Sequence, residues 1–238
     1  PTAAPPATPA AILALELAHS VHQMVQGKHG FTDAEMAEWM AERKRDQKRY
    51  SDPNRAYVVR EAQAHGHALA SHDDATEAHV EEAVRDRMTI AEFPTTVEAA
   101  AASHNAGLAV LMGAPNIVRG GSQSGNVSAL SLVEQGLCDA LVSDYYYPAL
   151  AAAAWRLVDA GLRTLPEAWA MISTIPAEIL GLCDRGELAR GRRADLVAVN
   201  AETRAIEMTI AGGALTYLSA GAAHRFASAS TGLSIAAE

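Results

Sequence analysis

The sequence is poor in cysteine. Only two of its 238 residues are cysteine, Cys138 and Cys183, and they form no Cys-x-x-Cys pair. This scarcity argues against a disulfide framework and against a zinc knuckle, and it fits a reducing compartment. We therefore expect a cytoplasmic protein in which both thiols are ordinary, semi-buried side chains.

Basic charge is also in short supply. The chain has 19 Lys and Arg against 28 Asp and Glu, which gives a formal net charge of −9. An acidic surface argues against non-specific nucleic-acid binding, because that requires a basic patch. An anionic small molecule stays possible, since a metal ion or a few arginines can reverse the field locally.

Long apolar runs are absent as well. The longest uncharged stretches run from the N-terminus to Leu15 and from Met208 to Ala223, and both are too short for a membrane span. The N-terminus has no basic region of the kind that begins a signal peptide. We therefore expect no membrane association. Apolar residues nevertheless make up 49% of the chain, enough for a sizeable core.

The N-terminal quarter predicts one strand and two helices. The apolar run Ile12 to Ala18 suits a buried strand, although its Leu and Ala content also permits a helix. Thr32, with Glu35 three residues on, has the pattern of a capping box and predicts the start of a charged helix. We expect Pro53 to end the charged stretch and a second helix to span residues 54–64.

Apolar segments then alternate with helical patterns. Strands are predicted at residues 67–71, 88–93, 108–112 and 139–143, and helices at 77–86, 97–105, 128–135, 149–160 and 165–173. Thr76 can cap the first of these helices, and Thr95 or Thr96 the second. Such alternation indicates βαβ units and a parallel sheet, and the apolar strands fit burial on both faces.

Polar side chains decide between a doubly wound sheet and a barrel. They follow the carboxyl ends of the predicted strands, at His19, His72, Asp73, Asp74, Asn116 and Asp144. In a barrel such positions converge on one face, where active sites are built. We therefore predict an α/β fold, part of a (β/α) TIM-type barrel over residues 11–183, after a flexible segment at 1–10. Short strands at 196–199, 205–210 and 214–218 predict that residues 184–238 form a small C-terminal β-rich segment.

Two histidines and an aspartate could hold a metal ion. Neutral imidazole and carboxylate suit Zn²⁺ or a similar cation, and such residues occur at His19, His72 and Asp144. A metal-bound water becomes a nucleophile near neutral pH, and an aspartate beside it can accept the proton. Taken singly, each residue also fits a structural role, as a hydrogen-bonded histidine or a helix or turn cap.

The flanking carboxylates have two interpretations each. Asp73 or Asp74 could orient a ligand imidazole through its second nitrogen, or cap the following helix. Glu92 lies inside a predicted strand, where a buried carboxylate needs a partner or a metal, unless it points into the helix layer.

The segment from Val118 to Asn126 is a candidate anion site. Its glycines allow main-chain N–H groups to approach an anion, its hydroxyls add donors, and Arg119 adds a bidentate positive charge. A plain connecting loop has the same composition and is the alternative.

Five motifs in order give the sequence a family resemblance. They are Ala70-Ser71-His72-Asp73-Asp74-Ala75-Thr76, Ala91-Glu92-Phe93-Pro94-Thr95-Thr96, Gly113-Ala114-Pro115-Asn116 with Arg119-Gly120-Gly121-Ser122, Ser124-Gly125-Asn126-Val127-Ser128-Ala129, and Ser143-Asp144-Tyr145. Together, over residues 31–218, the sequence resembles the phosphonate-metabolism hydrolases of the amidohydrolase superfamily, which serve the carbon–phosphorus lyase pathway.

The resemblance implies a substrate, a cofactor and roles for residues. It implies hydrolysis of α-D-ribose 1-methylphosphonate 5-triphosphate to the 5-phosphate and pyrophosphate, with one or two divalent metals, zinc or else manganese or iron. His19 and His72 match the family's single histidine ligands, and Asp144 matches an aspartate that is both ligand and proton acceptor. Substrate contacts are expected at Asp73, Asn116, Arg119, Ser122, Ser124 and Asn126.

The sequence also departs from the family pattern. No His-x-His occurs near the start, and Gln123 stands where the family usually has histidine. Five predicted strands run from His19 to Asp144, where the superfamily scheme has four. The chain alone cannot close an eight-stranded barrel, so we expect further strands, or a second subunit in a homo-oligomer, to cover the gap. Two alternatives stay open: the same barrel acting on a cyclic amide or aminated ring, and a non-catalytic barrel relic in a complex.

Overall fold

A computed structural model describes residues 28, 30–122 and 125–225. The chain divides into two compact units, residues 1–65 and 66–238. The expected flexible segment at 1–10, the strand at 12–18, His19 and Ser124 lie outside the described residues. The expected boundary between residues 183 and 184 stays a prediction.

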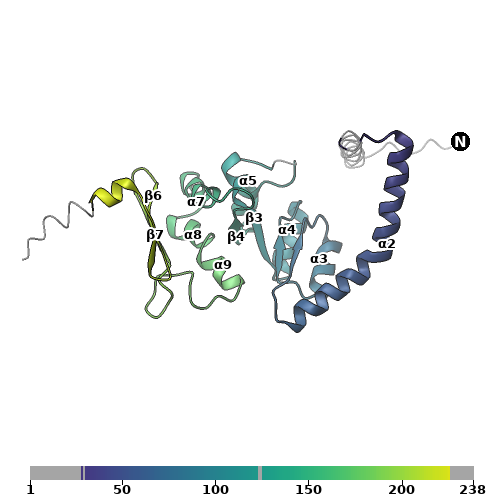
Figure 1. Ribbon diagram of the computed structural model, residues 1–238, viewed down its shortest axis with the longest axis horizontal. Helices are drawn as coiled ribbons and strands as arrows, with labels where there is room; N and C mark the ends of the chain where they lie inside the picture. The colour runs from purple at the N-terminus through teal and green to yellow at the C-terminus, as the bar shows by residue number, and fades with distance from the viewer. Residues whose placement is uncertain (1–27, 29, 123–124, 226–238) are drawn as a thin grey trace, which may run out of the picture. The chain divides into compact units, whose positions relative to one another are not determined.

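Helix α2 (Asp33–Ala64) makes up most of the described part of the first unit. Its capping box is confirmed: the Glu35 carboxylate accepts from the Thr32 amide at 2.8 Å, and the Glu35 amide donates to the Thr32 hydroxyl at 3.4 Å. The predicted break at Pro53 is wrong, because the helix continues through it. Strong helix formers on both sides outweigh the one hydrogen bond that proline removes. Figure 1 shows the helix bent, as an internal proline requires.

A parallel sheet organises the second unit. Its strands are β1 (Ala70–His72), β2 (Ile90–Glu92), β3 (Ala109–Gly113) and β4 (Ala140–Val142), hydrogen-bonded in the order β1-β2-β3-β4. Every neighbouring pair is parallel. Sequential order with parallel pairing brings all four carboxyl ends to the same edge of the sheet, as the predicted barrel requires.

Helices follow each strand. They are α3 (Glu77–Arg85), α4 (Val97–Asn105), α5 (Ala114–Arg119), α6 (Ala129–Glu134), α7 (Ala149–Asp159), α8 (Leu165–Ala170) and α9 (Thr174–Ile179). Thr76 and Thr96 cap α3 and α4, accepting main-chain hydrogen bonds at 3.4 Å and 3.0 Å. Helix α5 was predicted as loop. Pro115 in its first turn is a helix-start signal that the glycine-rich and serine-rich surroundings obscured.

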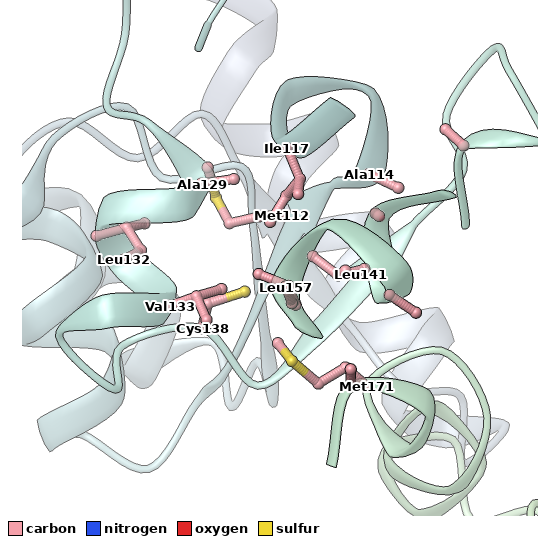
Figure 2. Packing of buried hydrophobic residues seen from close by; sticks show 14 of the residues in the cluster. Met112, Ala114, Ile117, Ala129, Leu132, Val133, Cys138, Leu141, Leu157 and Met171 are labelled. Atoms are coloured by element: carbon pink, nitrogen blue, oxygen red, sulfur yellow. The ribbon is translucent and has the colours of Figure 1, made fainter. Parts of the chain in front are cut away.

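The main core lies between β3, β4 and the helices that follow them. Figure 2 shows Met112, Ile117, Leu132, Leu157 and Met171 as members of one apolar cluster. Three of the five alanines of α7, Ala149, Ala153 and Ala154, are fully buried, so this helix packs closely. Because α5 and α7 bury their apolar sides here, the loops that follow β3 and β4 start from fixed positions.

A small antiparallel sheet follows the helices. It consists of β5 (Leu196–Val199), β6 (Ile206–Ala211) and β7 (Ala214–Leu218), in that order. Figure 1 places α8 and α9 between this sheet and the four-stranded one. Gly212 and Gly213 both have positive φ in the turn between β6 and β7, a conformation that glycine adopts without strain. Among the described helices, none is both long and apolar enough to cross a bilayer.

Candidate active site

The carboxyl edge of the parallel sheet carries a cavity of about 180 Å³. Of the residues predicted as site residues from the sequence, the lining includes Asp73, Asn116, Arg119, Ser122, Asn126 and Asp144. Phe93 and Tyr145 line it as well. Residues from the loops after four different strands therefore surround one space.

Three of the lining residues have a left-handed backbone. Asp73 has φ 60°, Phe93 has φ 56° and Asp144 has φ 50°. They lie immediately after β1, immediately after β2 and two residues after β4. Aspartate tolerates this conformation, whereas for a bulky phenylalanine it is strained. Strained backbone conformations are common at functional sites, where they orient side chains. Here the left-handed residues turn the chain at the cavity rim.

Main-chain hydrogen bonds tie the rim loops together. The amides of Asp73 and Phe93 extend the parallel ladder by donating to the carbonyls of Glu92 and Leu111, at 3.0 Å and 2.9 Å. The Thr95 amide then donates to the Asp74 carbonyl at 2.8 Å, and the Thr95 carbonyl accepts from the Val127 amide at 3.0 Å. The three loops are thus linked in series, which fixes the cavity rim.

His72 does not line the cavity. Its side chain is 56% exposed, its Nδ1 lies 3.1 Å from Oδ2 of Asp73, and its ring meets the Phe93 ring edge-on with centroids 5.3 Å apart. Asp73 is therefore placed to orient this imidazole, one of the two roles expected for it. Two strands separate β1 from β4, so about 14 Å of sheet lies between the strands that carry His72 and Asp144.

Asn116 and Ser122 have structural partners. Oδ1 of Asn116 accepts a hydrogen bond from the Ala129 amide at 3.1 Å, which holds the first turn of α6. The Ser122 hydroxyl accepts from the Asn126 amide at 3.2 Å. These bonds shape the loop around the cavity, and the substrate contacts expected of both residues stay predictions.

Asp74 is buried behind the rim. It does not cap α3, because Thr76 does. The residue is only 8% exposed, and its Oδ2 is buried without a hydrogen-bond partner among the described residues. Glu92 is half-buried at the end of β2, and the partner or metal expected for it stays a prediction.

The described residues do not by themselves form a metal site. Within residues 28, 30–122 and 125–225, no three His, Cys, Asp or Glu side chains gather closely enough to hold an ion. Asp73, Asp144 and His72 are donors of the right type, but only the two aspartates share the cavity lining. The ligand roles of His19, His72 and Asp144 remain predictions.

Sequence reasoning missed the two aromatic residues of the cavity lining. Phe93 and Tyr145 fall inside motifs that carried the family resemblance, but their aromatic rings gave no periodic signal. The Arg119 guanidinium donates a hydrogen bond to the Tyr145 hydroxyl. The two residues lie 26 positions apart, so only the folded chain reveals the contact.

A larger groove of about 1440 Å³ lies elsewhere in the same unit. Residues of α7, α8, α9 and the small sheet line it, and no predicted site residue does. Of these two spaces, only the smaller cavity is lined by residues predicted as site residues.

Comparisons with known proteins give a sequence relative and several structural neighbours. No family model matches the sequence. The chain is 51% identical over 174 residues to the α-D-ribose 1-methylphosphonate 5-triphosphate diphosphatase of Escherichia coli (strain K12). The predicted resemblance is confirmed. That stretch is 72% of this chain but 46% of the diphosphatase, so the chain spans less than half the length of this relative.

Solved structures agree on the fold. The N-acetylglucosamine-6-phosphate deacetylase of Pasteurella multocida matches with a TM-score of 0.53 at 12% identity, over 69% of this chain and 54% of that one. The ochratoxinase of A. niger matches with a TM-score of 0.52 at 20% identity, over 68% and 44%. The predicted fold class, an α/β fold that forms part of a (β/α) barrel with a small β appendage, is confirmed.

Proposed function

We propose that this chain forms part of a metal-dependent hydrolase that cleaves a phosphoanhydride of α-D-ribose 1-methylphosphonate 5-triphosphate. The supporting observation is the single cavity that combines a guanidinium, hydroxyl and amide groups, and carboxylates at the carboxyl edge of the sheet. The substrate is that of the diphosphatase, whose name states it and whose sequence is 51% identical over the aligned stretch.

Arg119, Ser122 and Asn126 supply the anion-binding side of the cavity. A triphosphate needs donors that point at its oxygens, and an arginine offers a planar fork of N–H groups that matches phosphate. In this proposal Arg119 binds a terminal phosphate, while the Ser122 hydroxyl and the Asn126 side-chain amide donate hydrogen bonds to phosphate oxygens. The pyrophosphate leaving group then departs already paired with a positive charge.

Asp144 supplies the proton acceptor. Water adds across the bond between the first and second phosphates: its oxygen bonds to phosphorus, the bridging oxygen leaves with pyrophosphate, and the 5-phosphate remains on the ribose. A carboxylate at the cavity wall can accept the proton that the attacking water loses. Asp144 is the carboxylate of the β4 loop, held there by its left-handed backbone.

A divalent metal would activate the attacking water. The described residues offer carboxylate and imidazole donors but no complete ligand set, so the proposal needs ligands from outside them. Metal dependence is tested by elemental analysis of the purified protein before and after chelation. A protein that retains almost no metal and gains nothing from added zinc or manganese would contradict this part of the proposal.

Phosphorus NMR tests the reaction itself. The protein is incubated with metal and a ribose 5-triphosphate ester, and pyrophosphate is expected as the first product. Stepwise release of orthophosphate, or no turnover, counts against the proposal.

Arg119→Ala separates phosphate chemistry from the amide-ring alternative. A phosphate site should lose at least ten-fold in kcat/KM, since a charge-assisted contact is worth about 1.5–3 kcal/mol. A site for a neutral ring would barely respond. Arg190→Ala, an exposed arginine outside the cavity, is the matched control.

A further inference from the structure

The contact between Arg119 and Tyr145 joins two segments across the mouth of the cavity. Arg119 is the last residue of α5, and Tyr145 directly follows Asp144 in the loop after β4. The arginine guanidinium donates to the tyrosine hydroxyl, and both residues line the 180 Å³ cavity. The contact is therefore part of the same space that holds the predicted phosphate-binding groups.

Both residues of the contact belong to segments whose main chains are held in place. Helix α5 buries Ala114 and Ile117 completely in the core, and Gly120 ends it in a left-handed cap. On the other side, a turn closes after β4 with the Tyr146 amide donating to the Ser143 carbonyl at 3.1 Å. The flexible element between these segments is the arginine side chain, whose rotamer freedom is large.

A phenol is well suited to hold that side chain. It accepts a hydrogen bond from one N–H of the guanidinium fork and carries no charge of its own, so the arginine stays cationic. If the guanidinium is held in place before an anion binds, the arginine side chain loses less conformational entropy on binding. Two carboxylates, Asp73 and Asp144, line the same cavity and repel an anion, which makes a well-placed cation more important.

We propose that Tyr145 is a positioning residue that holds Arg119 toward the phosphate groups of the ligand. The proposal rests on the proposed function for the nature of the ligand, a pyrophosphate-bearing molecule. Tyr145 itself is 63% exposed, so it supports the arginine from the rim and is not needed for the core.

The chain supplies its own controls, because three tyrosines follow one another. Tyr146 lies outside the cavity lining, and Tyr147 lines the separate larger groove. Tyr145→Phe removes one hydroxyl and keeps the ring, and Tyr146→Phe makes the same change one residue away. Circular dichroism of both variants checks that the fold is retained.

Calorimetric titration with inorganic pyrophosphate measures the effect directly. Tyr145→Phe is expected to weaken binding about five-fold, the net value of one ordinary hydrogen bond, because the hydroxyl acts on the anion only through the arginine. Tyr146→Phe is expected to leave binding unchanged. In the background of Arg119→Ala, the Tyr145→Phe change should have no further effect, because the hydroxyl acts through the arginine. Equal affinity in Tyr145→Phe and the parent overturns the proposal, as do losses that add in the double variant.

Steady-state kinetics separate this proposal from the proposed function. With the triphosphate ester, Tyr145→Phe should raise KM about five-fold while kcat changes less than two-fold. A loss confined to kcat would overturn the positioning role. If the parent binds pyrophosphate and Tyr145→Phe weakens it, but no pyrophosphate is ever released from the ester, the hydrolysis proposal fails and the positioning role stands.

Discussion

Arg204 and Asp159 join the small C-terminal sheet to helix α7 through two parallel hydrogen bonds of 2.6 Å and 2.7 Å. The Arg204 guanidinium also lies over the Trp155 ring, 4.7 Å from its centroid. The arginine comes from the connection between β5 and β6, 45 residues beyond its partner. Arg204 thus links the small sheet to helix α7. Because it lies over Trp155, the fluorescence of that tryptophan can detect changes in the contact.

The Arg204–Asp159 pair should be lost in acid. The hydrogen bonds from Arg204 hold the pKa of the Asp159 carboxyl below its usual range. Because the folded-state pKa is lowered, the stabilisation is present above the unfolded-state value near 3.9 and disappears as the pH falls through the folded-state pKa. Tryptophan fluorescence between pH 7 and pH 2 should show this step.

Asp159→Asn should remove that step in fluorescence. Asp184, paired with the adjacent Arg185 in the same unit, is the control, and Asp184→Asn should keep the step. An unchanged pH profile in Asp159→Asn would show that Trp155 does not sense the pair.

Leu157 is central to the core and intolerant of truncation. It is fully buried on α7, within the cluster of Figure 2. Leu157→Ala should lower the free energy of unfolding by about 2–5 kcal/mol, through lost apolar burial and the cavity left behind. Urea unfolding measures the change, and Leu180→Ala, at a 57% exposed site, should cost far less. Comparable losses in both variants would contradict the core shown here.

Gly186 is required by close contact as well as by its backbone. Its φ is +96°, and an added Cβ would lie 2.8 Å from the Ala177 Cβ and 3.2 Å from the Thr174 Cα. Gly186→Ala should cost about 2 kcal/mol or more, through overpacking against α9 and a strained φ. Gly191 has φ +85° but nothing near its Cβ position, so Gly191→Ala should show the backbone cost alone. Thermal unfolding of the two variants compares them, and equal shifts would refute the contact.

Pro53 should destabilise the helix that contains it. An interior proline costs about 3 kcal/mol relative to alanine, and Pro53 is exposed, so no packing is lost when it is replaced. Pro53→Ala should raise the helix signal of α2 and its melting temperature in circular dichroism. Asp52→Ala, at the preceding exposed position, is the control. A fall in helicity in Pro53→Ala would mean that the bend is needed.

The sequence predicted the parts of the fold that depend on local patterns. Thr32, Thr76 and Thr96 begin helices because a hydroxyl followed by helix-forming residues is a local signal. The parallel strands were found because they are apolar on both faces, although β1, β2 and β4 are shorter than predicted. Pro53 was misjudged because a proline is a local obstacle that a long, strongly helical segment can outweigh.

The site was predictable in its residue types and less so in its geometry. Asp73, Asn116 and Asp144 were predicted as site residues because they follow the ends of strands. Arg119 and Ser122 were predicted because they lie in a glycine-rich segment. All five line one cavity. The outward position of His72 depends on the turn at Asp73, which composition does not reveal. The role of Tyr145 depends on a contact between segments far apart in the chain, for which one sequence carries no signal.

The left-handed rim limits which substitutions the site can accept. At Asp73, Phe93 and Asp144 the backbone excludes valine, isoleucine and threonine, whose branched Cβ clashes in this conformation. Asparagine and glycine would keep the turn at either aspartate while changing its charge. If the pocket were redesigned for another ligand, few residue types could replace Asp73, Phe93 and Asp144. More residue types could be used around Arg119.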